Sequence, residues 1–143
     1  MQVVKGHKQE YFSSYDEKVR YEIEYTLNSL TKAQLCEVMS FSKPHPLVEK
    51  ILKIVYILYV DTAIKDDTMQ EITWQKTVQF LTDSNILQKL KEIDCKKINK
   101  ENLELVSTLL KDPGMNVADA QKYSIAASHL VHWAQTVVLY ASK

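Results

Sequence analysis

Apolar residues recur at helical spacing over the first long stretch that lacks glycine and proline, residues 15–38. The intervals are four, four and three, and the positions are Val19, Ile23, Leu27 and Leu30. This stripe is typical of an amphipathic helix, and we predict one that runs for about six turns. Thr31 and Lys32 interrupt the stripe, which resumes with Leu35. Pro44 ends the segment, because proline disfavours a helical residue before it.

A second helix is predicted from Pro46 to Val60. Proline is favoured in the first turn of a helix, and the residues that follow it are apolar nearly all round. A helix of that kind is mostly buried. The stretch from Asp61 to Glu71 is polar and acidic, and we predict an exposed loop there.

Shorter helices follow, each behind a residue that can cap its first turn. They are residues 74–81 after Thr73, 85–93 after Asp83 or Ser84, a helix up to 111 after Asn99, and 116–123 from Asn116. The last segment, 124–142, again lacks glycine and proline. Its main apolar positions are Ile125, Leu130, Trp133, Val137 and Tyr140.

The order of a long helix, several short helices and a long helix predicts an all-α fold. Two long terminal helices that flank a compact cluster pair antiparallel, because the cluster acts as one large turn. We therefore predict a small helical-bundle head on an antiparallel two-helix coiled-coil stalk segment. Residues 1–40 form the outgoing stalk helix, with 1–10 a candidate for disorder, 41–123 form the globular head, and 124–143 form the returning stalk helix.

Composition and charge narrow the class of protein. Of the 143 residues, 45% are hydrophobic, which is enough for one core. The 18 basic and 18 acidic side chains give zero formal charge, which argues against a nucleic-acid binder. No apolar run reaches the length of about 18 residues that spans a bilayer, and residues 1–8 lack a signal core. We predict no membrane partner and a cytoplasmic location, where Cys36 and Cys95 stay reduced, with a disulfide between them as an unsupported alternative.

Catalytic and metal-binding patterns are weak in this chain. His129 and His132 are close enough to share a helix face, but no third ligand is near in sequence, and a structural zinc site uses four. Asp66, Asp67 and Glu71 lack the alternating carboxylates and central glycine of a calcium loop. No GxxxxGK[ST] phosphate-binding motif occurs. We predict no catalytic residue, no metal site and no cofactor.

An ordered set of motifs resembles the stalk tip of dynein heavy chains, their microtubule-binding domain. The set begins with Leu27-Asn28-Ser29-Leu30-Thr31-Lys32, Glu37-Val38, Ser40-Phe41 and Pro44-His45-Pro46-Leu47-Val48. It continues with Trp74, Asp83-Ser84-Asn85-Ile86-Leu87, Leu90, Asp94, Asp112-Pro113, Ser124, Ala126-Ala127, Trp133 and Tyr140. The family usually has Phe at the position of Ile86. The spacing resembles the axonemal branch more than the cytoplasmic branch.

The resemblance implies a binding function. The head binds the groove between tubulin subunits, and the two stalk helices change register to pass the state of a distant ATPase to the head. Sliding by about half a heptad replaces one apolar layer by another. The implied partners are the microtubule and the rest of the heavy chain, and the implied location is the cytoskeleton, including the axoneme of a cilium.

Tubulin is strongly acidic, so the binding face should present basic side chains. The candidates are Lys43, Lys50, Lys53, Lys89, Lys122 and His132. Lys122 matches a basic position of the family, whereas His132 stands where lysine is common. Met39, Glu49 and Asp83 also replace basic residues of related sequences, and residues 43–122 carry 12 basic and 12 acidic side chains. These departures predict weaker or differently distributed binding.

Two alternatives remain open. The first is a dynein-like helical scaffold or regulatory module with weak or no tubulin affinity, which the neutral head favours. The second is a hydrolase or metal-dependent enzyme on a helical bundle, which needs convergent carboxylates or histidines that the sequence does not show. Trp74 and Trp133 are predicted to pack in the core rather than to anchor an interface.

Overall fold

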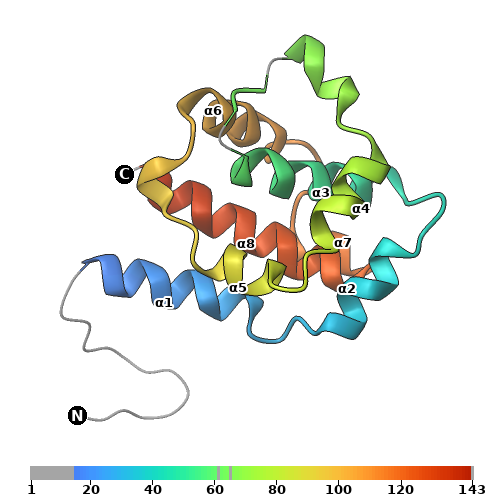
Figure 1. Ribbon diagram of the computed structural model, residues 1–143, viewed down its shortest axis with the longest axis horizontal. Helices are drawn as coiled ribbons and strands as arrows, with labels where there is room; N and C mark the ends of the chain where they lie inside the picture. The colour runs from blue at the N-terminus through green and yellow to red at the C-terminus, as the bar shows by residue number, and fades with distance from the viewer. Residues whose placement is uncertain (1–14, 61, 65, 143) are drawn as a thin grey trace.

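The computed structural model describes residues 15–60, 62–64 and 66–142. Its α-helices are α1 (Tyr15–Leu27), α2 (Lys32–Met39), α3 (Pro46–Tyr59), α4 (Trp74–Leu81), α5 (Ile86–Lys91), α6 (Lys100–Leu109), α7 (Val117–Gln121) and α8 (Ile125–Ala141). Two short 3-10 helices, η1 (Asp66–Glu71) and η2 (Cys95–Lys97), lie between them. These ranges contain no strand, so the predicted all-α fold is confirmed (Figure 1). The disorder predicted for residues 1–10 falls outside the described residues.

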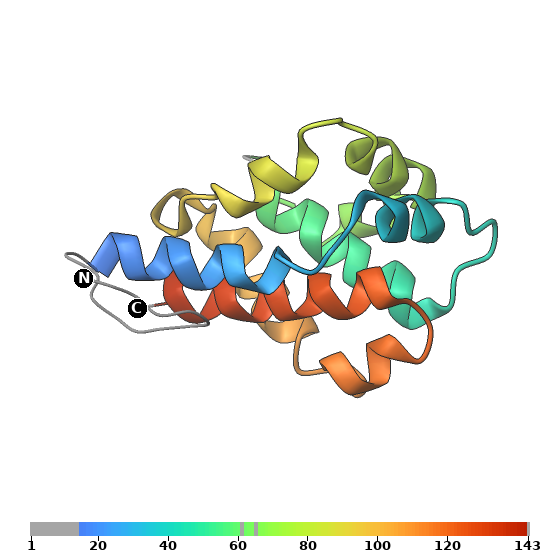
Figure 2. The same cartoon turned by 90° about the horizontal axis from the view of Figure 1, so that it is seen from below.

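The two terminal helices, α1 and α8, lie side by side and run antiparallel (Figure 2). Nine residues of α8 are buried, and five of them, Ala126, Leu130, Trp133, Val137 and Tyr140, recur at intervals of four, three, four and three. On α1, Ile23 and Leu27 are at most 1% exposed. The hydroxyl of Tyr140 donates a hydrogen bond to Glu22 Oε1 and so fixes one helix against the other. The beginning of α1 and the end of α8 therefore lie at the same end of the molecule.

The single long helix predicted for residues 15–38 is wrong, because the chain breaks it into α1 and α2. Thr31 Oγ1 accepts the backbone N–H of Gln34, and Gln34 Oε1 accepts the N–H of Thr31, both at 3.1 Å. This reciprocal capping box satisfies two backbone donors and starts a new helix. The break falls where the apolar stripe was interrupted, and the second helix still buries Leu35 and Val38.

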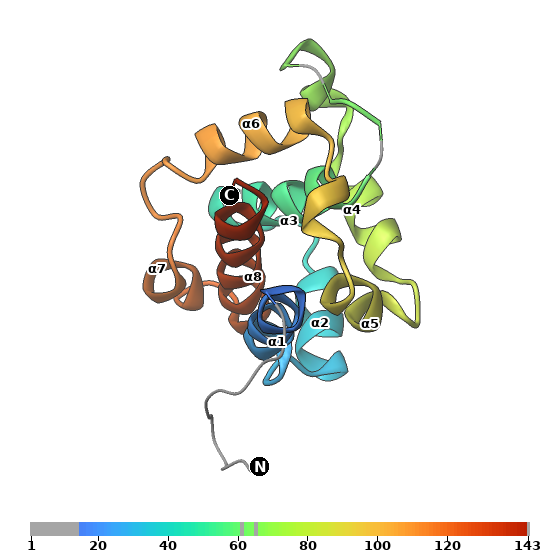
Figure 3. The ribbon, with the colours of Figure 1, turned by 90° about the vertical axis from the view of Figure 1, so that its left-hand side faces the viewer.

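Helices α3 and α8 supply the centre of the core. The buried residues of α3 are Val48, Ile51, Leu52, Ile54, Val55, Ile57 and Leu58. Figure 3 views α8 nearly end-on, with α1, α3 and α7 around it. Trp133 is fully buried, and its Nε1 donates to the carbonyl of Leu90 at 3.0 Å. Half-buried Trp74 donates to the carbonyl of Phe41 at 2.9 Å and packs against the core. The predictions of a buried α3 and of core tryptophans are confirmed.

A buried asparagine holds the chain that leaves α3. Asn102 of α6 is 0% exposed, and its Oδ1 accepts the N–H of Ile64 at 2.7 Å. Its Nδ2 donates to the carbonyls of Ile57 at 3.1 Å and Thr62 at 2.9 Å. Buried polar groups are costly unless they are hydrogen-bonded. Asn102 therefore sets the path of the chain between α3 and η1.

Most of the predicted helix starts are present. Side chains that accept a first-turn N–H belong to Thr73, Asn99, Asn116 and Ser124. Helix α5 differs, because it begins at Ile86 and its N-cap residue, Asn85, makes no side-chain cap. Asp83 Oδ1 instead accepts the N–H of Asn85 at 2.8 Å, which tightens the turn before the helix. Within the stretch predicted as a loop, 61–71, the chain forms η1.

The two cysteines are free thiols. Cys36 is exposed on α2, whereas Cys95 is only 8% exposed at the start of η2. Burial, followed by the nearby charge of Asp94, raises the pKa of the Cys95 thiol to about 11. The two cysteines therefore form no disulfide with each other, and the predicted reduced thiols are confirmed.

Candidate functional site

The N-terminal end of α3 meets the junction between α7 and α8. His45 is the N-cap residue of α3, and its Nδ1 accepts the backbone N–H of Leu47 at 3.1 Å. The His45 ring stacks on the ring of Tyr123, with centroids 3.7 Å apart and planes inclined by 13°. Lys43 lies two residues before His45, and Lys122 lies directly before Tyr123. This stacked pair therefore brings together the two segments that carry Lys43 and Lys122.

A second contact ties Lys50 of α3 to the turn after α6. Lys50 Nζ, one turn into α3, lies 2.7 Å from Asp112 Oδ2 in the turn after α6. Gly114 completes that turn with φ +87°, a conformation that favours glycine, and it lies against Leu47. Lys53 follows one turn further along α3.

We name Lys43, Lys50, Lys53 and Lys122 the distal lysine face. All four belong to α3, to the segment before it, or to the α7–α8 junction. The start of α3, the segment before it and the α7–α8 junction lie at the end opposite to the beginning of α1 and the end of α8 (Figure 2), and Lys53 lies about midway along α3. The antiparallel helix pair therefore carries the face at its far end.

The charges of the face are partly paired within the chain. Lys122 Nζ lies 3.4 Å from Asp119 Oδ1, and its side chain is 68% exposed. A hydrogen bond from Asn116, and then one from Lys122, lower the pKa of Asp119. Lys43 and Lys53 have no hydrogen-bond or ion-pair partner among the described residues. Exposed pairs of this kind are weak and screened by salt, so an acidic partner can compete for the lysines.

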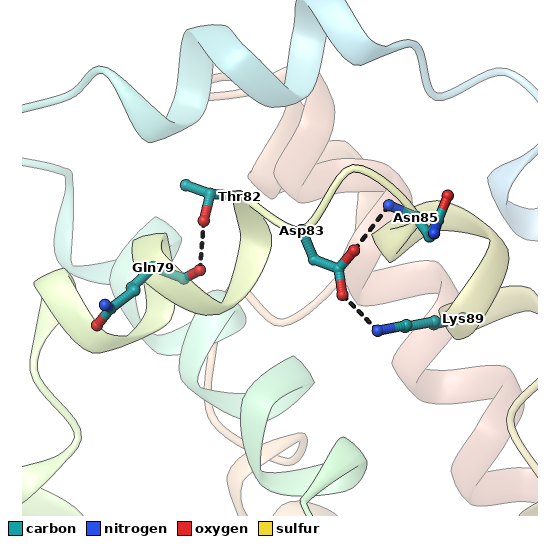
Figure 4. Close-up of polar contacts among 5 residues, drawn as sticks. All are labelled: Gln79, Thr82, Asp83, Asn85 and Lys89. Carbon is teal, nitrogen blue, oxygen red and sulfur yellow. Dashed lines mark hydrogen bonds and ion pairs between the residues drawn. The ribbon is translucent and has the colours of Figure 1, made fainter.

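Lys89 lies away from the distal lysine face. Figure 4 shows its ammonium against Asp83 Oδ2 in the turn before α5. The hydrogen bond between them lowers the pKa of Asp83 and raises that of Lys89. Lys89 shares a hollow with Tyr59 and Val60, at the C-terminal end of α3. A helix of 14 residues is about 20 Å long, so the C-terminal end of α3 lies about that far from its start.

His132 also lies apart from the face. It sits on α8 and lines a hollow of about 230 Å³ together with Tyr21, Tyr25 and Thr136. Its neighbour His129 is half-buried, and burial, followed by the charge of His132, lowers the pKa of His129. Both histidines therefore belong to the side of the α1–α8 pair. Among the described residues, no three His, Cys, Asp or Glu side chains form a group suited to a metal ion.

Sequence reasoning missed the stacked pair of His45 and Tyr123. A residue in extended conformation directly before a helix-starting proline is an N-cap position, so the run Pro44-His45-Pro46 carried a usable signal for His45. The partner ring on Tyr123 had none, because the contact joins segments far apart in sequence. Around it, Val117, Tyr123 and Ile125 are between 38% and 44% exposed, which makes this surface partly apolar.

Met39 and Glu49 stand where related sequences have basic residues, and both have a structural role here. Met39 is partly buried and packs against the core at the end of α2. Glu49 stands in the first turn of α3, where a negative charge is favourable near the positive end of the helix dipole. Neither position therefore needs a basic residue for folding. Across the described ranges, no helix is both long enough and apolar enough to cross a bilayer.

Comparison with known proteins relates most of the chain to one class. It is 27% identical over 119 residues to the dynein-1-beta heavy chain of the flagellar inner arm I1 complex of Chlamydomonas reinhardtii, covering 83% of this chain. It is 30% identical over 110 residues, or 77% of this chain, to human dynein axonemal heavy chain 6. It is 22% identical over 121 residues, or 85% of this chain, to the cytoplasmic dynein heavy chain of Caenorhabditis elegans.

The chain spans 2% of the length of each of these three relatives. No protein-family model matches it. The chain is therefore an all-helical segment related to dynein heavy chains, and the resemblance found in its motifs is confirmed at that level. Relatives with axonemal and with cytoplasmic names both match, so the preference for the axonemal branch stays a prediction.

Proposed function

We propose that this chain is the microtubule-binding tip of a dynein stalk and attaches to tubulin through the distal lysine face. The observation that carries the proposal is the position of this face. The His45–Tyr123 stack gathers lysines from separate segments at the far end of an antiparallel helix pair. Similarity to dynein heavy chains supports the same reading.

The proposed binding is mainly electrostatic. Tubulin is acidic, and lysines at the rim of an interface act through charge complementarity and steering of the encounter. Lys43 and Lys122 are the exposed members of the face and are proposed to make first contact. The apolar surface around Tyr123 is then buried against tubulin, and its removal from water stabilises the complex.

The rest of the heavy chain is the second proposed partner. It continues from the α1–α8 end, and ATP hydrolysis takes place there rather than in this chain. A change of register between α1 and α8, which alters the contact of Tyr140 with Glu22, is proposed to set the affinity of the face. The proposed location is the cytoskeleton, including the axoneme of a cilium.

Co-sedimentation with microtubules over a salt series tests this function. Between 10 mM and 150 mM salt the Debye length falls from about 30 Å to about 8 Å. We expect the affinity to fall by about tenfold or more over that range, because the contacts are between exposed charges. Pelleting that is strong and independent of salt would contradict the electrostatic account.

A scaffold or regulatory module with little tubulin affinity is the second candidate function. It is favoured by one observation, which is that Lys50, Lys89 and Lys122 each pair with an aspartate of the same chain. If the chain stays in the supernatant at the lowest salt concentration while folded, this second function replaces the first.

A further inference from the structure

A cavity of about 570 Å³ lies where α1 and α8 meet the segment that leads into α6. Its walls come from Val19 and Arg20 of α1, from Lys100 and Leu103 of α6, and from Tyr140 of α8. Figure 3 views the molecule from this end. The cavity is at the opposite end from the distal lysine face, and its volume falls in the usual range of small-molecule sites.

Three cations, Arg20, Lys96 and Lys100, and two carboxylates, Glu92 and Asp94, line the cavity, which leaves one positive charge in excess. Arg20, the only arginine in the chain, and Lys100 have no ion-pair or hydrogen-bond partner among the described residues. The two carboxylates accept hydrogen bonds from uncharged donors. Glu92 accepts a hydrogen bond from Gln88 Nε2 at 2.7 Å, and Asp94 accepts the backbone N–H of Lys96 at 3.0 Å. Neither carboxylate forms an ion pair with Arg20 or Lys100, so these two cations remain available to an anion from outside.

We propose that this cavity binds an organic phosphate, held by Arg20 and Lys100 at its charged end. A guanidinium presents a planar fork of donors that matches phosphate oxygens, and the lysine adds a point charge. Val19, Leu103 and Tyr140 offer apolar surface to the body of the same molecule. Such a ligand bridges α1, α6 and α8. The proposal is independent of tubulin binding, because it concerns residues at the other end of the molecule.

The test uses 1-naphthyl phosphate as the probe, with titration calorimetry and amide NMR on the full chain in the absence of microtubules. We expect binding in the millimolar range or tighter, with shifted amide signals in residues 19–20, 94–103 and 140–141. The double variant Arg20→Gln/Lys100→Gln should bind at least tenfold more weakly. The variant Lys76→Gln, an exposed lysine on α4, should bind as the unchanged chain does.

Two further measurements distinguish the contribution of the phosphate group from that of the apolar body of the ligand. Inorganic phosphate lacks the apolar body and 1-naphthol lacks the charge, so each should bind at least tenfold more weakly than the probe. The probe should also slow the reaction of Cys95, which lines the cavity, with a thiol reagent, while exposed Cys36 reacts at an unchanged rate.

Any of three results would overturn the proposal. They are the absence of binding at millimolar probe, equal binding by Arg20→Gln/Lys100→Gln, and inorganic phosphate binding as tightly as the probe. The substituted side chains are exposed, so we expect each variant to fold. The amide NMR spectrum of each variant checks this.

Discussion

Replacing Trp133 by alanine should lower the free energy of unfolding by about 4 kcal/mol, a typical result for a buried aromatic residue. The side chain is 0% exposed on α8, the helix that contacts α1, α3 and α7. The substitution removes the ring from the centre of the core and one of the hydrogen bonds that the carbonyl of Leu90 accepts, while the bond from the N–H of Ile93 at 3.4 Å remains. A cavity and the loss of a buried hydrogen bond both destabilise the folded state.

Urea unfolding of the Trp133→Ala variant measures this effect, with Trp133→Phe as the matched control. Phenylalanine keeps most of the buried apolar area but still loses the hydrogen bond, so we expect a smaller loss of about 2 kcal/mol. Trp74 remains in both variants as a fluorescent reporter. A loss below about 1 kcal/mol for Trp133→Ala would show that α8 does not hold the core as described.

The sequence was sufficient for the elements whose signals are local. Helix α3 could be predicted because its residues are apolar nearly all round and Pro46 marks its start. Helix α8 could be predicted because residues 124–142 lack glycine and proline and because its apolar spacing continues to Tyr140. The caps of α4, α6 and α7 were also visible, because a cap needs only a polar side chain beside the first turn.

The break between α1 and α2 had a local signal in the sequence, but the apolar periodicity was given more weight in the prediction. The apolar stripe continues from Leu27 through Leu30, so periodicity alone favours one helix. Thr31 and Gln34 form the pattern of a capping box, and their reciprocal hydrogen bonds start the second helix. A prediction that weighed this pattern above periodicity would have found the break.

The grouping of the basic residues depends on tertiary contacts that no local pattern encodes. Lys43 and Lys122 meet because the ring of His45 stacks on that of Tyr123. Lys89, by contrast, is held by Asp83 only six residues earlier, at the other end of α3. A list of candidate lysines was therefore within reach of the sequence, but its division between two ends of the molecule was not.

Reversing the charge of the two exposed lysines that flank the stack should weaken microtubule binding about a hundredfold, if each reversal costs about 1.4 kcal/mol. The variant is Lys43→Glu/Lys122→Glu, which places two carboxylates against an acidic polymer. Neither side chain is buried, so the helical content and the unfolding transition should stay close to those of the unchanged chain.

The matched control is Lys89→Glu/Lys97→Glu. It changes the net charge by the same amount, but both residues line the hollow at the C-terminal end of α3. Because these residues lie away from the distal lysine face, we expect the affinity of this control for microtubules to fall by less than about tenfold. A general effect of net charge would instead weaken both variants alike.

Microtubule co-sedimentation of these two variants beside the unchanged chain, at one low salt concentration, is the most direct test of the distal lysine face. We expect Lys43→Glu/Lys122→Glu to stay in the supernatant while Lys89→Glu/Lys97→Glu pellets with the microtubules. Equal pelleting of both variants, or release of the control alone, would contradict it.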